Sequence, residues 1–307
     1  MSAHVYGPVP SRRLGFSLGV DIIPLKTCSF DCIYCQLGRT KKKTIVRRKF
    51  FSSQEILQSI RAALRSGQRI DFITFSGSGE PTLNRLIGKL IREIKKLTPI
   101  PVAVLTNSSL ISQKSVRESL LEADVVIPSL DAATAPTFKK VNRPEASVKI
   151  KVVVKGLESF RRDFTGEIWL EVVLVKGIND SPADIEALKK AIARINPDRV
   201  HLNTVVRPPA ERWAFPLTRE ELEEIRAQLG GPAEIVADFH KKPQPAAAGS
   251  LEEAILSLVS RRPATTKDIA AALGRNKAEV LRQLNDLLSA KKIRVVRHKG
   301  RDFYEPK

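Results

Sequence analysis

Seven short apolar runs alternate with helical segments over most of the chain, and this alternation leaves few architectures open. The runs are rich in Val, Ile and Leu and lie at residues 18–24, 70–77, 102–107, 124–131, 167–177, 199–206 and 233–239. Serines mark the start of two intervening helical segments, at Ser52 or Ser53 and at Ser181. Apolar strands separated by amphipathic helices are typical of a parallel sheet buried on both faces. We therefore predict an α/β fold, a partial (β/α)6 TIM-like barrel, with its chemistry at the carboxyl ends of the strands.

Polar and glycine-containing segments follow several of these runs. Because the carboxyl ends of parallel strands meet at one edge, we expect these segments to converge on one mouth of the barrel. They comprise residues 76–81, Asn107, Ser129, Asp131, Asn203 and Thr204. Turns between strands and helices are also polar where they have no function, and that alternative stays open for each residue.

All three cysteines of this 307-residue chain lie within the segment KTCSFDCIYCQLG. Cys28, Cys32 and Cys35 are too clustered for a disulfide framework, and such clusters more often bind metal or do chemistry. A structural zinc site usually has four protein ligands, so zinc would need a histidine from elsewhere in the chain. An iron–sulfur cluster held by three cysteines instead leaves one iron free for a further ligand.

The charge of the chain is strongly positive. Lys and Arg number 52 against 33 Asp and Glu, and much of the excess lies in RTKKKTIVRRK, directly after the cysteines. Such a field attracts phosphates, which makes nucleic acid the natural partner. The candidate contacts in this segment are Lys41, Lys42, Lys43, Arg47 and Arg48. A basic run is also compatible with solvated surface that binds nothing, and this alternative stays open.

A segment rich in Pro and Ala near residues 240–250 separates the strands from a different pattern. We predict a barrel over residues 1–240, a linker at 241–250 and a second domain over 251–307. This second domain shows three helical patterns and then a ribbon, which is the order of a winged helix-turn-helix. Its candidate nucleic-acid contacts are Lys277, Arg282, Arg297 and Lys299. A docking module for a protein or peptide is the alternative, because one fold serves both purposes.

No run approaches the roughly 18 to 20 apolar residues that cross a bilayer. The N-terminal segment MSAHVYGPVPSRRLG also lacks the apolar core of a signal peptide. We therefore expect a cytoplasmic protein with no membrane contact, in which the cysteines stay reduced.

The spacing Cys-x3-Cys-x2-Cys, with Tyr34 before the last cysteine, resembles the signature of the radical S-adenosylmethionine (SAM) superfamily. The resemblance implies a 4Fe–4S cluster on Cys28, Cys32 and Cys35, with SAM on the open iron. It further implies reductive cleavage of SAM to methionine and a 5′-deoxyadenosyl radical, with a flavodoxin or ferredoxin as the electron donor.

The same resemblance implies which residues contact SAM. The segment FSGSGEP lies where the superfamily has a glycine-rich turn for the methionine amino group, which implicates Gly77, Gly79 and Glu80. Glu171 lies on the predicted fifth strand, where the family often binds the ribose, and a surface ion pair is the alternative for it. The residues implicated at the adenine are Asn203 and Tyr34. Valine at position 79 is expected to crowd SAM and leave the iron content intact.

The segments YGPVPSRRLG, SGSGEPTL, SLDA, NRP and HLNTVVRPP together resemble the branch of the superfamily that contains the tRNA wyosine synthases. Those synthases carry further cysteines for a second cluster, which this chain lacks. The resemblance therefore favours an enzyme that modifies RNA, with tRNA as the first candidate, without identifying the reaction. The candidate residues on the substrate side are Asn107, Asp131 and Arg143. Modification of a protein or peptide, and a non-enzymatic DNA-binding regulator, are the alternatives.

Overall fold

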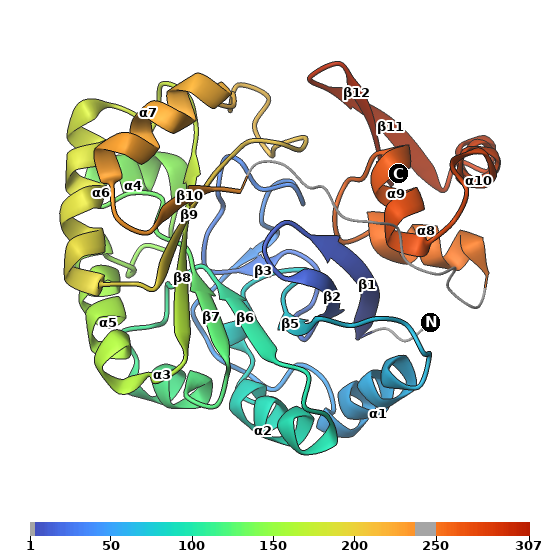
Figure 1. Cartoon of the computed structure of the whole chain (residues 1–307), viewed down its shortest axis with the longest axis horizontal. Coiled ribbons are helices and arrows are strands. Elements are labelled where there is room, and N and C mark those ends of the chain that lie inside the picture. The colour runs from blue at the N-terminus through green and yellow to red at the C-terminus, as the bar shows by residue number, and fades with distance from the viewer. Residues whose placement is uncertain (1–3, 237–249) are drawn as a thin grey trace.

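The computed structural model describes residues 4–236 and 250–307. Its centre is an eight-stranded sheet with the strand order β1-β2-β5-β6-β7-β8-β9-β10. Neighbouring strands from β2 onwards are parallel, whereas β1 pairs antiparallel with β2. The sheet curves round with helices on its outer side (Figure 1). The predicted α/β fold with a mostly parallel sheet is therefore confirmed.

Each predicted apolar run overlaps a strand of this sheet. These strands are β2 (Gly15–Val20), β5 (Phe72–Phe75), β6 (Val102–Thr106), β7 (Val125–Pro128), β8 (Glu167–Leu174), β9 (Arg199–Thr204) and β10 (Ala233–Ile235). The part of the last run at 237–239 lies outside the described residues. The sequence pattern does not predict β1 (Val5–Ser11), because Pro8 and Pro10 interrupt it. Proline cannot donate to a ladder, and β1 accommodates two prolines because it is the edge strand.

Helices follow the strands and form the outer layer (Figure 1). They are α1 (Ser53–Leu64), α2 (Ile87–Leu97), α3 (Lys114–Leu120), α4 (Ala135–Asn142), α5 (Ile150–Asp163), α6 (Pro182–Ile195) and α7 (Arg219–Leu229). Two of the predicted starts are capped, since the Ser52 side chain accepts from Gln54 N and that of Ser181 accepts from Asp184 N. Within residues 4–236 and 250–307, every helix is too short or too polar to span a bilayer.

One large cluster of buried apolar side chains joins the sheet to the helices, and a smaller, separate cluster comprises Leu14, Ala103, Val125, Ile127 and Trp169. Phe75, Phe160 and Leu18 are among the largest fully buried members of the large cluster. Burying a side chain of this size contributes about 1.5 to 3 kcal/mol. The strand ends that carry polar residues therefore stand on a rigid base.

The C-terminal unit, residues 251–307, consists of three helices and an antiparallel ribbon. Its elements are α8 (Leu251–Val259), α9 (Thr266–Leu273), α10 (Lys277–Ser289), β11 (Ile293–His298) and β12 (Arg301–Pro306). Assignment of this unit to the winged-helix class stays a prediction. So does the boundary between the two parts, because residues 241–249 of the predicted linker lie outside the described residues.

The C-terminal unit packs directly on β1, as Figure 1 shows at its right-hand side. Tyr6 and Val9 of β1 belong to the same buried apolar cluster as Ile255 and Ile269 of the unit. The Arg261 guanidinium also lies 5.0 Å from the centre of the Tyr6 ring, at cation–π distance. The sequence pattern does not predict this contact, because the strand that makes it carries no clear apolar alternation.

Candidate active site at the cysteine loop

The cysteine loop, residues 26–38, leaves the end of β2 and is held between two other segments. Its short strand β3 (Thr27–Cys28) pairs with β4 (Lys42–Lys43) on one side. On the other side Glu80 N, in the turn after β5, donates to Thr27 O at 3.2 Å. Thus the position of Cys28 is set by the carboxyl ends of the first parallel strands, where the sequence predicts the chemistry.

The three thiols are partly exposed, and two of them accept hydrogen bonds from side-chain amides. Asn107 Nδ2 lies 3.4 Å from Cys28 Sγ, and Asn142 Nδ2 lies 3.5 Å from Cys32 Sγ. Donors of this kind stabilise metal-bound thiolates and tune the potential of an iron–sulfur cluster. The amides are therefore placed to hold the first and second sulfur.

Without a metal, the thiols of Cys28 and Cys32 keep their protons. Burial, with a smaller contribution from the Glu80 charge, raises the pKa of Cys28 to about 12, and burial also raises the pKa of Cys32. Metal ligation requires the thiolate, so cationic iron supplies the charge that these positions need. No group of three or more His, Cys, Asp or Glu side chains in the described part of the chain is arranged around a single ion. Three thiols are one ligand fewer than a structural zinc site usually has, so they fit a cluster with one open iron better than the zinc alternative.

Gly79 lies against the cysteine loop. A Cβ at this position would lie 1.8 Å from Thr27 O and 2.9 Å from Ile23 Cγ2. Because Thr27 O belongs to the backbone of β3, any side chain here displaces the strand that carries Cys28. This corrects the expectation that a larger residue would spare the iron. Gly77 has φ +134° and lies beside the Asp21 carboxylate, and contact of either glycine with SAM stays a prediction.

Glu80 is buried and joins two turns at the mouth of the barrel. Its Oε1 accepts from Thr82 Oγ1 at 2.6 Å and from Thr106 Oγ1 at 2.7 Å, and its Oε2 accepts from Asn107 N at 2.7 Å. Burial raises the pKa of Glu80, and these donors oppose that rise. The carboxylate thus fixes Asn107, which contacts Cys28, while its contact with the SAM amino group stays a prediction.

Asp131 follows β7 and connects Tyr34 with the amide beside Cys32. Tyr34 Oη donates to Asp131 Oδ2 at 2.5 Å, and Asn142 Nδ2 donates to the same oxygen at 2.6 Å. Val173 N donates to the other oxygen at 2.8 Å. Burial outweighs these donors and raises the pKa of Asp131 to about 6. A carboxyl group that titrates near neutrality inside a site is a candidate for proton transfer.

The raised pKa of Asp131 predicts a specific dependence of stability on pH. Between about pH 4 and 6 the folded protein holds the Asp131 proton, whereas the unfolded chain has lost it. The contribution of Asp131 to the free energy of unfolding is therefore present at low pH and is lost as pH rises through about 6. Asp131→Asn stays neutral. Between pH 4 and 7 the free energy of unfolding of the parent should therefore fall by about 2 kcal/mol relative to the variant, measured by urea unfolding of the iron-free protein. A difference that does not change with pH contradicts this prediction.

Glu171 on β8 lies among interior charges. Its Oε1 accepts from Arg13 Nη1 and, at 3.2 Å, from Asn203 Nδ2. Arg12 Nη1 donates to Asn203 Oδ1 at 2.8 Å. Burial acts to raise the pKa of Glu171, but Arg13 and Arg12 outweigh it and leave that pKa lowered. The ion-pair alternative for Glu171 thus has partly buried Arg13 as its partner. Contact of Glu171 and the adjacent Asn203 with the adenosine stays a prediction.

Arg143 is held in an ion-pair group at the rim of the cysteine loop. Its Nη1 lies 2.6 Å from Glu211 Oε1, and Arg39 Nη2 lies 2.7 Å from the same oxygen. Its guanidinium also lies 5.9 Å from the centre of the exposed Trp213 ring. Of the three candidate substrate-side residues, Asn107 and Asp131 contact groups of the cysteine loop, whereas Arg143 pairs with carboxylates.

The basic candidates of both segments lie on the surface, with one exception. Arg47 is half-buried, and its Nε donates to Thr82 O at 2.8 Å. The exposed candidates are Lys41, Lys42, Lys43 and Arg48 after the cysteines, and Lys277, Arg282, Arg297 and Lys299 in the C-terminal unit. Within the described ranges, none of these residues has a carboxylate oxygen within 4.0 Å. Their charges are therefore available to an anionic partner.

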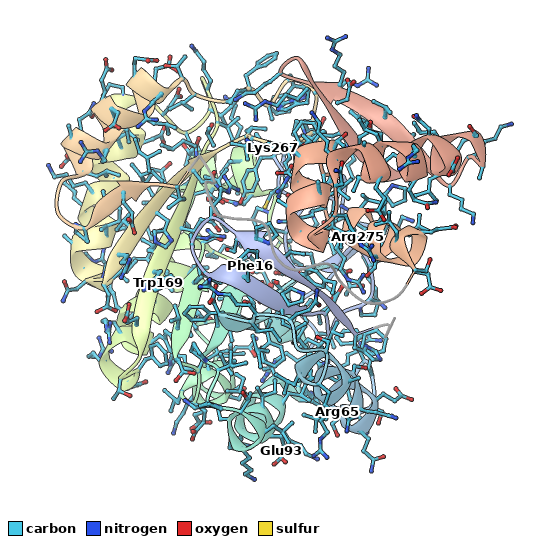
Figure 2. All side chains as sticks on the ribbon, turned by 45° about the vertical axis from the view of Figure 1, so that its right-hand side comes forward. Phe16, Arg65, Glu93, Trp169, Lys267 and Arg275 are labelled. Atoms are coloured by element: carbon cyan, nitrogen blue, oxygen red, sulfur yellow. The ribbon has the colours of Figure 1, made fainter. Side chains whose placement is uncertain are left out.

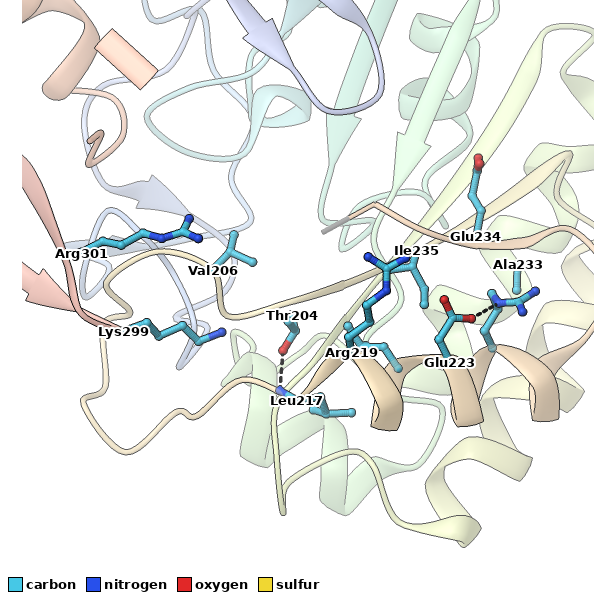
Figure 3. Close-up of a pocket in the computed structure, with 12 residues that line it drawn as sticks. Thr204, Val206, Leu217, Arg219, Glu223, Ala233, Glu234, Ile235, Lys299 and Arg301 are labelled. Carbon is cyan, nitrogen blue, oxygen red and sulfur yellow. Dashed lines mark hydrogen bonds and ion pairs between the residues drawn. The ribbon is translucent and has the colours of Figure 1, made fainter. Parts of the chain in front are cut away.

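A groove of about 620 Å³ lies between the barrel and the ribbon of the C-terminal unit. Figure 3 shows Lys299 and Arg301 reaching in from the ribbon, with Arg219 opposite them on α7. Arg226, which also lines the groove, is paired with Glu223 at 2.7 Å. The two parts of the chain thus form one basic surface here.

Sequence reasoning misses several residues that the structure brings to this mouth. Asn142 contacts both Asp131 and Cys32, and Arg12 and Arg13 contact Asn203 and Glu171. The segments SRR and NRP contain these residues. In a chain with 52 Lys and Arg, however, no local pattern separates an interior arginine from a surface one.

Comparison with known proteins gives the following similarities. Residues 22–192 match the sequence model of the radical SAM superfamily. A UPF0026 protein of Methanocaldococcus jannaschii is 33% identical over 97% of this chain and 94% of its own length. A GTPase Obg of Brachyspira hyodysenteriae is 41% identical over 94% of this chain, which spans only 43% of that protein. The crystal structure of a radical SAM methyltransferase from Sphaerobacter thermophilus superposes with a TM-score of 0.53 at 17% identity, over 71% of this chain and 65% of that one, and so shares the fold.

Proposed function

Because this chain belongs to the radical SAM superfamily and, within it, to the UPF0026 proteins, we propose that it uses radical SAM chemistry to modify RNA, with tRNA as the substrate. It is an enzyme that binds a 4Fe–4S cluster and cleaves SAM. Such enzymes need an external electron donor, and a flavodoxin or ferredoxin is proposed here. Membership leaves the substrate open, so the RNA is the part that must be tested.

In this proposal Cys28, Cys32 and Cys35 hold the cluster. When bound, the cluster supplies the electron that splits SAM into methionine and a 5′-deoxyadenosyl radical. The chain itself orients the reactants and excludes water. Asn107 and Asn142 donate to two of the sulfurs and so fix the side of the loop on which the thiolates lie.

The residues proposed for SAM lie on both sides of the cysteine loop. The backbone at Gly77 and Gly79 would receive the methionine end, with Glu80 holding that turn in place. Tyr34, oriented by Asp131, would flank the adenine. Glu171 and Asn203 would accept and donate hydrogen bonds to the adenosine, and their mutual contact at 3.2 Å keeps both oriented.

The observation that carries the RNA proposal is the pairing of β4 with β3. Lys42 is the partner of Thr27, and Lys43 is the partner of Cys28. Paired strands lie about 4.8 Å apart, so exposed lysines stand next to a cluster ligand. A polyanion held by these lysines would lie beside the reaction centre.

The C-terminal unit offers a second basic surface for the same partner. Lys299 and Arg301 line the groove with Arg219, and Lys277 and Arg282 are exposed on or beside α10. Two basic surfaces on one molecule suit an extended polyanion better than a small one, because each phosphate contact releases counterions and adds to affinity. We include a winged-helix role in nucleic-acid binding for this unit in the proposal.

Replacing Lys41, Lys42 and Lys43 by glutamine is expected to weaken tRNA binding and flatten its dependence on salt. Each lost phosphate contact reduces the slope of log affinity against log salt by about 0.7 to 0.9, so the triple variant should lose about 2 to 3. Anisotropy titrations with total tRNA at several salt concentrations measure this slope.

The matched control replaces three exposed lysines on the outer helices, Lys151, Lys155 and Lys189, by glutamine. It removes the same charge from a face away from the cysteine loop and should keep the parent's slope. Equal slopes for the parent and the loop variant would reject the RNA path, as would a parent that binds no tRNA. The modification itself is tested by mass spectrometry of tRNA nucleosides, in which a deletion strain should lack one modified nucleoside.

A polypeptide substrate is the second candidate, favoured by two exposed aromatic side chains, one of which lies at the rim of the cysteine loop. Trp213 and Phe215 are 44% and 60% exposed, and Trp213 lies against Arg143 at the rim of the loop. Exposed aromatic residues suit protein interfaces. Binding of a polypeptide that is insensitive to salt, together with absent tRNA binding, would select this candidate. Membership in an enzyme superfamily sets aside the non-enzymatic regulator.

A further inference from the structure

Three arginines from distant parts of the chain form a cluster between the barrel and the C-terminal unit. Arg12 follows β1, Arg207 follows β9 and Arg262 follows α8. Each is partly exposed. Burial lowers the pKa of Arg207 to about 9 and that of Arg12 to about 10, and the charges of Arg262 and Arg12 add to the effect on Arg207. Arg262 also acts on Arg12, so the three partly exposed guanidinium groups lie within electrostatic reach of one another.

The polar partners of this arginine cluster are neutral. Arg207 Nη1 donates to Gln36 Oε1 at 3.0 Å, and Arg12 Nη1 donates to Asn203 Oδ1 at 2.8 Å. Arg262 Nη1 lies 3.5 Å from a backbone carbonyl, and its buried Nε has no hydrogen-bond partner in the described structure. No described carboxylate oxygen lies within 4.0 Å of any of the three side chains. Several donors of the cluster thus lack an anionic acceptor.

Like charges brought together away from bulk water are unfavourable unless an anion lies between them. Asp268 acts on all three arginines from a distance, but its Oδ2 is occupied by the capping of α9, where it accepts from Thr265 N at 3.1 Å. Glu171 also acts on Arg12, but its Oε1 accepts from Arg13 Nη1. Guanidinium groups bind both carboxylate and phosphate through pairs of parallel hydrogen bonds, but a phosphate offers three acceptor oxygens where a carboxylate offers two, so one phosphate can bind several arginines at once. The chemistry of the cluster therefore points to a phosphate group.

The location of the cluster connects it to the reaction centre. Gln36, the partner of Arg207, directly follows Cys35, and Asn203, the partner of Arg12, contacts Glu171. Arg207 thus borders the cysteine loop, and Arg12 borders the predicted adenosine contacts. Arg262 comes from the C-terminal unit, so the site is incomplete without that unit.

We propose that Arg12, Arg207 and Arg262 form a binding site for a phosphate group of the substrate, a nucleotide either free or within RNA. The site would hold the phosphate so that the attached nucleoside faces the cysteine loop. The inference deepens the proposed function and rests on it for the RNA source of the phosphate. It also gives the C-terminal unit a part in the active site in addition to its exposed basic surface.

The test uses the full-length protein with its 4Fe–4S cluster reconstituted. It compares two variants of the arginine cluster, Arg207→Gln and Arg262→Gln, with the control Arg65→Gln. Arg65 is exposed at the end of α1, away from the C-terminal unit (Figure 2). Inorganic tripolyphosphate, GTP and total tRNA are titrated in turn, and SAM is titrated separately. Loss of a hydrogen bond to a charged group costs about tenfold or more in affinity. Arg207→Gln and Arg262→Gln should each bind tripolyphosphate and GTP at least about tenfold more weakly than the parent. Arg65→Gln should bind all ligands with the parent's affinity, and every variant should bind SAM with the parent's affinity.

Each outcome decides the inference. Parent-like affinity for tripolyphosphate and GTP in both cluster variants overturns it, and so does a loss confined to SAM, which would assign the arginines to the cofactor. If tripolyphosphate and GTP respond as expected but the parent fails to bind tRNA, the phosphate site stands and the RNA proposal fails. If both arginine variants bind tRNA and tripolyphosphate with the parent's affinity, while the triple lysine variant of the cysteine loop binds tRNA more weakly, the RNA proposal stands and the phosphate site fails. The two variants lie in different parts of the chain, so a folding defect in one leaves the other to decide.

Discussion

Replacing Cys32 by alanine should remove the cluster and reduce SAM cleavage to background, the largest effect that we expect of any single substitution. The chain has three cysteines, and the described structure offers no histidine or carboxylate group that completes a metal site beside them. The anaerobically reconstituted parent should hold about four irons and four sulfides per chain on three thiolates. The variant should lose the visible absorbance of the cluster and produce no 5′-deoxyadenosine when reduced with SAM present.

The matched control is Ser29→Ala, one residue from the first ligand. Ser29 Oγ lies 2.6 Å from Ser109 Oγ and 3.3 Å from Asn107 Oδ1, so alanine disturbs the packing of the loop but removes no thiol. This control should retain iron and cleave SAM, although its melting temperature should fall. Normal iron and sulfide content in Cys32→Ala would reject the three-cysteine site.

Replacing Gly79 by alanine is expected to have the second largest effect. The added Cβ would lie 1.8 Å from Thr27 O, and backbone on both sides must move to relieve that overlap. Overpacking of this kind costs about 1 to 3 kcal/mol or more. Because the displaced residue is bonded to Cys28, iron content and stability should fall together. Iron analysis and thermal unfolding of the purified variant measure both effects.

Gly67→Ala separates this steric effect from the general cost of replacing a glycine. Gly67 has φ +71° and no atom within 4 Å of an added Cβ, so its cost is backbone strain of about 1 to 2 kcal/mol. That variant should hold the parent's iron content. If Gly79→Ala assembles its cluster as well as Gly67→Ala does, the cysteine loop does not depend on the close approach at position 79.

The apolar runs of the sequence lead to the right strands because a strand buried on both faces has a local signature of Val, Ile and Leu. The edge strand β1 has no such signature, since Pro8 and Pro10 remove it. The same strand carries Tyr6 and Val9, which pack with the C-terminal unit. The missed strand and the missed contact between the two parts therefore have one cause.

The residues around the thiols divide in the same way. The sequence singles out Asn107 and Asp131 because they follow predicted strands, and both contact the cysteine loop or its neighbours. Arg143 comes from a family-like segment, but the structure pairs it with Glu211. Asn142, the last residue of α4, makes the contact with Cys32 instead, whereas Arg143 follows the helix end in the left-handed conformation at φ +45°, and no local pattern distinguishes the two positions.

The sequence by itself determined the parallel strands and, through the resemblance of its cysteine spacing to a known family, the chemistry of the cofactor, because apolar runs and three cysteines within eight residues are local properties of the chain. Only the tertiary structure decided which polar groups meet. Arg12 and Asn203 are 191 residues apart and 2.8 Å from each other, and Arg262 reaches the same region from a unit that packs on β1. Such contacts depend on how the curved sheet packs against the C-terminal unit. The free energy of that packing comes from the burial of many apolar side chains. No short segment encodes it, so the arginine cluster has no signature in the sequence.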